Sequence, residues 1–160
     1  MKRKIKFRGK DVRTSHWVYG AFHEHIDITP AAFYKNSESR ENHIKEHTHH
    51  LIIQDAFSDF CMPRNIQCFE VTSETVGQFT GFTDCVTREI YEDDILHFER
   101  YGKNYTALVK WNDEVGAWCM QLRYEPRCGC RPLSEWLNEE CLEVIGNIHD
   151  NPELFRKQNQ

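Results

Sequence analysis

The sequence predicts a mainly β or α+β fold of antiparallel strands, and three observations support this. Short stretches rich in β-branched and aromatic residues recur along the chain, bounded by Gly, Pro and Asn. Helix signals are confined to two short segments near the C-terminus. In the C-terminal half the strand spacing is typical of a small SH3-like barrel, in which closure removes exposed strand edges.

Two strands are predicted near the N-terminus. Residues 4–8 alternate basic and apolar side chains, so Ile5 and Phe7 are expected to face a core. Residues 17–22 are rich in aromatic and β-branched side chains, which favour a second strand. The polar connection between the two segments predicts an antiparallel pair.

The middle of the chain is predicted to be a polar insertion flanked by strands. Residues 35–50 are very polar, and we interpret them as an exposed loop with at most one helical turn. Residues 51–53 and 68–71 are expected to be further strands, with Pro63 breaking the chain between them. Residues 1–75 would therefore form an N-terminal β region.

The remainder of the chain, residues 76–160, carries the barrel-like pattern. The strands predicted there are residues 94–98, 105–111, 117–122 and 144–148. Ser134 is expected to cap a short helix. Asn151, followed by Pro152 and Glu153, is expected to cap a short C-terminal helix, because Pro fits the first helical turn.

Composition is that of an ordinary globular protein. With 160 residues, of which 39% are hydrophobic, the chain can bury a core as one domain. The net charge of −5 argues against a general binder of nucleic acids or anionic membranes. No apolar run approaches the roughly 18 residues of a membrane helix. We expect no secretory signal and a cytoplasmic location, where the seven cysteines would be reduced.

Several irregular sequence segments occur in a specific order. They are Ile5–Gly9, Trp17–Gly20, Val76–Gly81, Glu89–Leu96 and Glu143–Leu154. Together they resemble the YopX family, which is carried by phages and integrated elements of bacteria. The resemblance covers both ends and the middle of the chain but not roughly residues 25–70. It implies a single YopX-like domain over residues 1–160 and assigns no biochemical activity.

The chain departs from the family pattern at two glycine positions. Where the family has Gly, this chain has Thr87 and Asp93. A non-Gly residue with positive φ is uncommon, although Asp is among the better tolerated. Tight turns are therefore less expected at these two positions than in the family pattern.

Histidines form one candidate metal site. His43, His47 and His50 would share one face if their segment were helical, and neutral imidazoles on such a face can bind Zn²⁺ or Ni²⁺. The weak helix signals favour a hydrated polar loop instead.

Cysteines form a second candidate metal site. Cys128 and Cys130 are a CxC pair that could hold zinc together with Cys119 and Cys141. Only one short pair is present, however, and zinc sites usually have two, so free thiols are the favoured interpretation. We expect no cofactor.

The basic N-terminus is a candidate nucleic-acid-binding segment. Its residues Lys2, Arg3, Lys6 and Arg8 lie beside predicted aromatic strands. Positive charge next to aromatic rings can hold a phosphate backbone. The favoured interpretation is a solvated outer strand face, because the chain is acidic overall.

A metal-dependent hydrolase is a further alternative. Asp93, Asp94 and His97, or His149 and Asp150, could supply metal ligands. Asp93 and Asp94 would point to opposite faces of a strand, however, which argues for a turn followed by a strand start. We assign no catalytic residues, because no coherent catalytic set is present.

The favoured hypothesis is an accessory protein of phage or mobile-element origin that acts by binding and assembly. A homo-oligomer is expected, with a phage or host protein as a further partner and no membrane association. Aromatic side chains dominate protein interfaces. The candidates for such contacts are Trp17, Tyr19, Trp118 and Trp136.

Overall fold

The computed structural model describes residues 4–27, 36–55, 65–123 and 131–156. The chain divides into two compact units, with a boundary between Val76 and Gly77. Of the described residues before β1, Lys4 and Ile5 belong with the C-terminal unit. Strands dominate both units, and the strand pairs within each are antiparallel, which confirms the predicted β-rich class. None of the described helices has the length and apolar character needed to cross a membrane.

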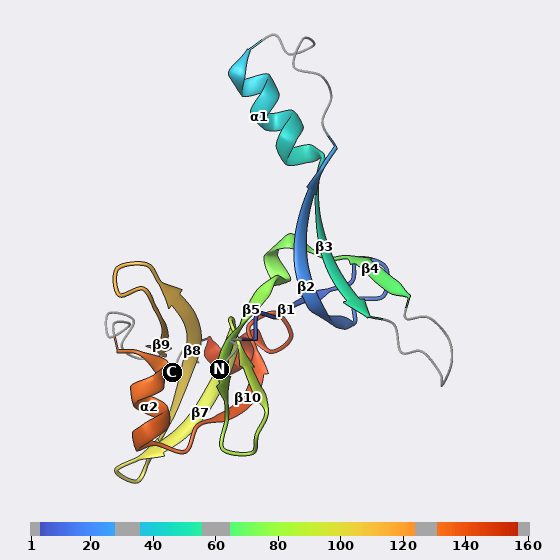
Figure 1. Cartoon of the computed structure of the whole chain (residues 1–160). Helices are drawn as coiled ribbons and strands as arrows, with labels where there is room; N and C mark the ends of the chain where they lie inside the picture. The colour runs from blue at the N-terminus through green and yellow to red at the C-terminus, as the bar shows by residue number, and fades with distance from the viewer. Residues whose placement is uncertain (1–3, 28–35, 56–64, 124–130, 157–160) are drawn as a thin grey trace. The chain divides into compact units, whose positions relative to one another are not determined.

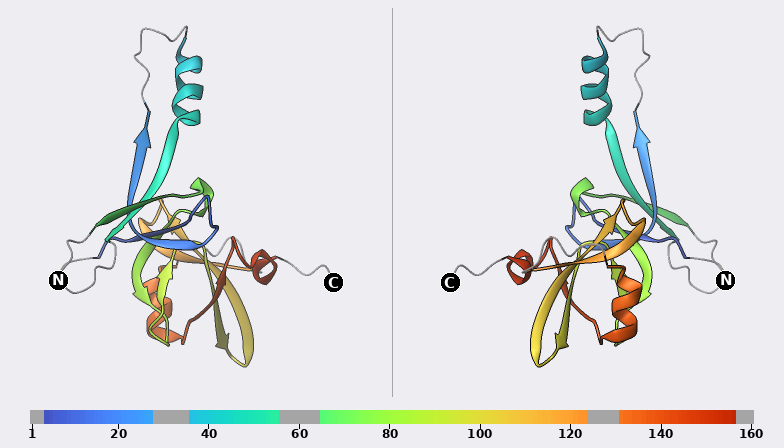
Figure 2. Two further views of the ribbon diagram at one scale, coloured as in Figure 1. Left: turned by 90° about the vertical axis from the view of Figure 1, so that its right-hand side faces the viewer. Right: turned by 90° about the vertical axis from the view of Figure 1, so that its left-hand side faces the viewer.

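Four strands of the N-terminal unit lie side by side in the order β4-β3-β2-β1. Their bounds are β1 (Phe7–Lys10), β2 (Trp17–Ile26), β3 (Thr48–Asp55) and β4 (Ile66–Glu70). β1 and β2 pair as predicted, and the short 3-10 helix η2 (Ser73–Thr75) ends the unit. The strands β2 and β3 form a long hairpin, with the helix α1 (Ser37–Glu46) at its far end (Figures 1 and 2).

The prediction of an exposed loop over residues 35–50 is wrong, because α1 occupies most of that segment. The side chain of Asn36 caps the helix by accepting a hydrogen bond from the Ser39 N–H (2.7 Å). Glu38 lies in the first turn, where a negative charge interacts favourably with the helix dipole. None of its residues is buried, so the helix has no apolar stripe that hydrophobic periodicity could detect.

The apolar core of the N-terminal unit is small. Ile52 and Val71 are its only fully buried hydrophobic side chains among the described residues. Phe7 packs against Phe22 with ring centroids 5.5 Å apart. The expectation that Ile5 faces a core is wrong, since this side chain is 68% exposed.

The C-terminal unit contains a four-stranded sheet in the order β10-β7-β8-β9, and it also contains the antiparallel pair β5 and β6. The strands are β5 (Gly77–Thr83), β6 (Glu89–Tyr91), β7 (Asp94–Arg100), β8 (Lys103–Asn112), β9 (Ala117–Leu122) and β10 (Glu143–Asn147). The two helices are α2 (Leu133–Glu139) and α3 (Pro152–Phe155). The four strands predicted between residues 94 and 148 are therefore confirmed.

The predicted closed barrel is not confirmed, because β9 and β10 lie at opposite edges of an open sheet. Side chains from outside the sheet complete the core of this unit. Leu133 and Trp136 of α2 pack with Ile90 of β6 and with the sheet residues Phe98 and Met120. A helix and a strand pair thus bury the sheet face that strand closure would otherwise have enclosed.

Both helix-cap predictions in this unit need correction. α2 begins after Pro132 rather than at Ser134, and α3 follows Asn151 without a side-chain cap. Asn151 packs instead against Gly146: a Cβ at Gly146 would lie 2.5 Å from the Asn151 Oδ1. The Asn151 side chain therefore faces the β10 backbone rather than the first turn of α3.

Candidate functional site

Two of the irregular segments identified in the sequence, Glu89–Leu96 and Glu143–Leu154, meet at the turn between β6 and β7. The Asp93 N–H donates to the Val109 carbonyl (3.0 Å), and the Asp93 carbonyl accepts from the Ile148 N–H (3.0 Å). β10 pairs with β7 so that Asn147 lies opposite Asp94. The backbone of the second segment is thereby held against the turn of the first.

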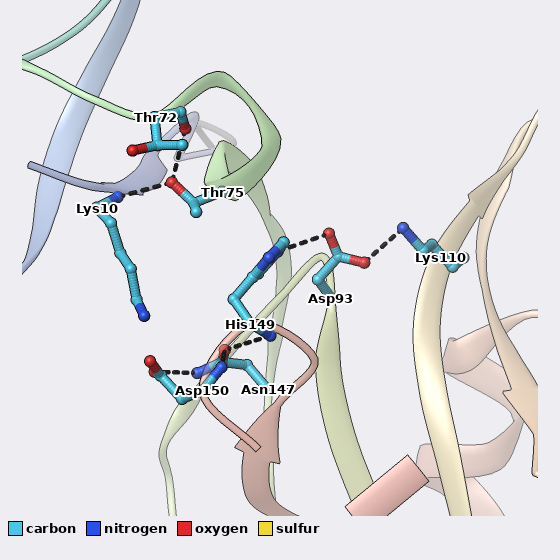
Figure 3. Close-up of polar contacts among 8 residues, drawn as sticks. All are labelled: Lys10, Thr72, Thr75, Asp93, Lys110, Asn147, His149 and Asp150. Carbon is cyan, nitrogen blue, oxygen red and sulfur yellow. Dashed lines mark hydrogen bonds and ion pairs between the residues drawn. The ribbon is translucent and has the colours of Figure 1, made fainter. Parts of the chain in front are cut away.

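The side chain of Asp93 lies at the centre of a small polar network (Figure 3). Its Oδ2 is 3.2 Å from His149 Nε2, and its Oδ1 is 2.5 Å from Lys110 Nζ. Asp93 is buried, whereas 46% of the Lys110 side chain is exposed. The cation therefore compensates a carboxylate that burial would otherwise destabilise.

Asn147 organises the loop that carries His149 (Figure 3). Its Oδ1 accepts hydrogen bonds from the His149 N–H (3.0 Å) and the Asp150 N–H (2.9 Å). Its Nδ2 donates to Asp150 Oδ2 (2.8 Å). Asn147 thus acts as a local turn-forming residue, and Asp150 is engaged within the same loop.

Asp84 is another buried carboxylate of this unit that binds the backbone. Its Oδ1 accepts from the N–H groups of Val86 (3.0 Å) and Arg88 (2.7 Å), and its Oδ2 accepts from the Val144 N–H (3.1 Å). The Arg88 Nη1 donates to the Val144 carbonyl (2.5 Å). These bonds join the loop after β5 to β10, so this acid has a structural role.

The ligand set expected for a hydrolase is not assembled. Asp94 is 1% exposed, and its Oδ2 accepts a hydrogen bond from the Tyr91 N–H (2.8 Å). His97 is half-buried, and its Nε2 lies 3.2 Å from Asn104 Oδ1. Across the described part of the chain, no three His, Cys, Asp or Glu side chains are grouped so that they could hold a metal ion.

An aromatic surface lies on the hairpin of β8 and β9. Trp111 and Val115 are each 43% exposed. The ring of Trp111 meets that of Trp118 edge-on, with centroids 5.1 Å apart, and its Nε1 donates to Asp113 Oδ1 (2.9 Å). We call Trp111 and Val115, together with the pocket beside them, the Trp111 surface.

The pocket of the Trp111 surface has a volume of about 370 Å³. It lies between the irregular part of β5, the β8–β9 hairpin and the start of α2. Its lining residues are Thr80, Gly81, Phe82, Trp111, Gly116, Ala117, Trp118, Pro132 and Ser134. Three aromatic rings in one small hollow are typical of a contact site for another molecule.

A family model described as YopX protein matches residues 6–156. The chain belongs to the YopX family. The matched range includes residues 25–70, for which the sequence segments gave no resemblance. Comparison with curated proteins gave no match.

One solved structure similar to this YopX-family chain is the crystal structure of protein EF1440 from Enterococcus faecalis. The two share 21% sequence identity with a TM-score of 0.49, and the match covers 97% of this chain and 100% of that chain.

In this YopX-family chain, basic side chains of the N-terminal unit lie over aromatic rings of β2. The Nζ atom of Lys6 is 5.2 Å from the ring centroid of Tyr19. The Arg8 guanidinium carbon is 4.7 Å, and the Lys10 Nζ 5.5 Å, from the ring centroid of Trp17. Arg8 is only 6% exposed, so this candidate nucleic-acid residue is packed rather than presented to solvent. Lys2 and Arg3 lie outside the described residues.

Two threonines hold the end of the N-terminal unit against β1 (Figure 3). The Lys10 N–H donates to Thr75 Oγ1 (2.9 Å), and the Thr75 hydroxyl donates to the Thr72 carbonyl (2.7 Å). These bonds satisfy backbone groups and therefore have a structural role.

The three histidines proposed as metal ligands do not converge. His43 and His47 stack on each other with ring centroids 3.8 Å apart, and the His47 Nδ1 is 2.9 Å from the His43 carbonyl oxygen. His50 lies on β3 and stacks on Phe22 at 5.9 Å. Sequence spacing placed all three on one helix, but α1 ends at Glu46, before His50.

His49 is a functional candidate that the sequence reasoning missed. Its Nδ1 is 2.7 Å from Glu70 Oε1, and its Nε2 is 3.7 Å from Asp27 Oδ2. The hydrogen bond to the Glu70 carboxylate raises the pKa of His49 above its ordinary value, against the opposing effect of burial. Only the pairing of β3 with β4 reveals this contact.

Two of the four cysteines proposed as zinc ligands, Cys119 and Cys141, lie within the described residues. Cys128 and Cys130 lie outside the described residues. Cys119 is buried in β9, and Cys141 is exposed and lies close enough to Cys85 to raise the pKa of that thiol. The partnership with Cys85 was missed because the two residues are far apart in sequence.

The four aromatic residues proposed for interfaces differ in exposure. Trp118 and Trp136 are buried in the core of the C-terminal unit, at 7% and 8% exposure. Trp17 is half-buried, and Tyr19 is 40% exposed. Trp111 was not selected from the sequence, although its position at the end of a strand beside a polar turn signalled an accessible ring.

Proposed function

We propose that this YopX-family protein is an accessory protein of phage or mobile-element origin that acts in the cytoplasm by binding and self-assembly rather than by catalysis. The observation that carries the proposal is the Trp111 surface. A second copy of the chain is the proposed occupant of this surface.

Three properties of the Trp111 surface support a role in assembly. Trp111 and Val115 leave apolar area in water beside a hollow that a partner side chain can fill. Trp111 is held in place by Trp118 and Asp113, so little side-chain entropy is lost on binding. Ordered aromatic rings of this kind supply much of the binding energy in protein interfaces.

The buried carboxylates favour a non-catalytic role. Asp84 and Asp94 accept hydrogen bonds from backbone N–H groups, and Asp93 is engaged by Lys110 and His149. Each acid therefore stabilises a turn or a strand start. Asp93 and Asp94 are the two of these acids that the hydrolase alternative would have used, so their structural engagement supports binding over hydrolysis.

Charge gives the proposed self-association a distinctive salt dependence. Each copy carries a net charge of −5, and Asp113 and Glu114 lie in the hairpin of the Trp111 surface. Like charges would meet when two copies associate, and salt screens that repulsion. Self-association should therefore strengthen as salt concentration rises.

The test is light scattering across a concentration series, with Trp111→Ala and Val115→Glu as disrupting variants. Tyr101→Ala is the matched control, because Tyr101 is an 88% exposed aromatic in the β7–β8 turn, away from the Trp111 surface. We expect the wild type and the control to form oligomers. Both disrupting variants should associate at least about tenfold more weakly, the usual effect of losing an interface hot spot. A wild-type chain that stays monomeric at every concentration would refute self-assembly, and capture of a phage or host protein would then identify another occupant.

A nucleic-acid-binding module is the second candidate, supported by the cation–aromatic contacts of β1 and β2. A mobility-shift assay distinguishes it, because binding to a phosphate backbone weakens with salt. A shift at low salt that is lost when Lys2, Arg3 and Lys6 are neutralised would favour this candidate. No shift at low salt would eliminate it.

A further inference from the structure

Two cysteines of the C-terminal unit are held side by side by the backbone. Cys85 lies in the loop after β5, and Cys141 lies between α2 and β10. The Cys85 N–H donates to the Leu142 carbonyl (3.0 Å), and the Cys141 thiol lies close enough to the Cys85 thiol to raise its pKa. The bond from the Val144 N–H to the Asp84 carboxylate fixes the same two segments from the other side. The backbone contacts of the two segments therefore bring these two cysteines together.

Both thiols are accessible to reagents in water. Cys85 and Cys141 are exposed, whereas Cys119 is buried. A pocket of about 360 Å³ adjoins Cys85, and Leu137 and Leu142 are among its other lining residues. Neither thiol contributes to the Trp111 surface or to the network around Asp93. Their contact therefore remains unexplained by any role described above.

We propose that Cys85 and Cys141 form a reversible dithiol–disulfide site that is oxidised by a small-molecule disulfide such as oxidised glutathione. One protein thiolate attacks a sulfur of the oxidant, which breaks the oxidant's S–S bond and releases one thiol. The second protein thiolate then attacks the protein sulfur of the mixed disulfide and displaces the other thiol. The protein loses two protons and two electrons, and the oxidant gains both.

The surroundings of the pair assign an order to these two attacks. The hydrogen bond with Cys141 raises the pKa of Cys85 to about 11, with further contributions from burial and from the negative charges of Cys141, Asp84 and Glu143. This raised pKa disfavours the Cys85 thiolate, so we assign the first attack to Cys141. Once Cys141 is part of the mixed disulfide, the largest cause of the raised pKa is gone and Cys85 can ionise for the second attack.

The disulfide would tie the loop after β5 to the segment preceding β10. Restricting the unfolded chain in this way stabilises the native state. We expect oxidation to raise Tm by about 5 °C or more, the shift typical of a stabilising crosslink in a unit of this size. The site is independent of the proposed self-assembly, because no residue of the Trp111 surface takes part.

The test is incubation of the full chain with oxidised glutathione, followed by N-ethylmaleimide, proteolysis and mass spectrometry. We expect a peptide that links Cys85 to Cys141, that is lost after dithiothreitol, and that forms faster as pH rises. Cys68→Ser is the matched control, because Cys68 is an exposed thiol on β4, and it should leave the link unchanged.

The variant Cys141→Ala tests the assigned order. It removes the main cause of the raised pKa, so N-ethylmaleimide should label Cys85 faster at pH 8 than in the wild type. Unlinked Cys85 and Cys141 after wild-type oxidation, recovered as maleimide adducts or as separate mixed disulfides, would overturn the proposal. Unchanged labelling of Cys85 in Cys141→Ala would overturn the order of attack.

Discussion

Thr87 and Asp93 occupy backbone positions that favour glycine, with φ angles of 68° and 67°. The YopX pattern usually has Gly at both positions, so the sequence alone did not favour tight turns here. Both residues nevertheless adopt the left-handed backbone conformation. Asp93 is supported there by its bonds to Lys110 and His149, whereas the β-branched Thr87 is poorly suited to positive φ.

Glycine substitutions at these two positions should have different effects. Thr87→Gly removes an unfavourable left-handed conformation, and we expect it to raise the free energy of unfolding by about 0.5–1 kcal/mol. Asp93→Gly gains the same relief but loses the contacts of the carboxylate, so it should be neutral or destabilising. Urea denaturation of the two variants, compared with the wild type, measures both effects. A Thr87→Gly variant that is less stable than the wild type would contradict the explanation.

At the scale of the element, the β2–β3 hairpin depends on close backbone approach. A Cβ at Gly20 would lie 2.1 Å from the Ile53 carbonyl oxygen, which is backbone and cannot move without disturbing the strand pair. Ala21 lies directly opposite Ile53 in the register of this pair. Gly20 is therefore required by packing rather than by its φ angle.

Gly20→Ala should weaken the hairpin. We expect a loss of about 2 kcal/mol in the free energy of unfolding, as for other overpacked sites. The matched control is Glu24→Ala on the same strand, because the Glu24 side chain is half-exposed and its ion pair with His50 is long, at 3.8 Å. Thermal or chemical denaturation measures both. A Gly20→Ala variant as stable as the control would show that the strands can separate without cost.

At the scale of the whole molecule, burial is uneven between the two units. Ile52 and Val71 are the fully buried hydrophobic residues described in the N-terminal unit, whereas the C-terminal unit has an extensive core centred on Phe98, Met120 and Trp136. The N-terminal unit consequently has less apolar stabilisation per strand. Local opening is easiest where few apolar contacts must be broken.

Hydrogen exchange should reveal this difference. We expect backbone amides of β7 and β8 to exchange at least about 100-fold more slowly than those of β2 and β3, because their opening exposes a much larger core. Mass spectrometry of peptides from each strand pair, in the intact chain, gives the comparison. Equal protection of the two strand pairs would show that burial does not set their local stability.

Much of the fold could be predicted from local patterns. The strands between residues 94 and 148 were identified because alternating burial and turn residues are properties of neighbouring positions. The helix α1 was missed because its stability comes from capping at Asn36 rather than from an apolar stripe. The candidate sites were harder to predict from the sequence. The contacts of Asp93 with His149 and of Cys85 with Cys141 join residues that are far apart in the chain.

The sequence by itself determined the β-rich class, the positions of four C-terminal strands and membership of the YopX family, because each depends on residue order and short-range periodicity. Only the tertiary structure decided that the sheet stays open, that Trp118 is buried while Trp111 is accessible, and which carboxylates bind backbone amides. Burial and pairing are long-range properties, because they depend on which other element covers a given face.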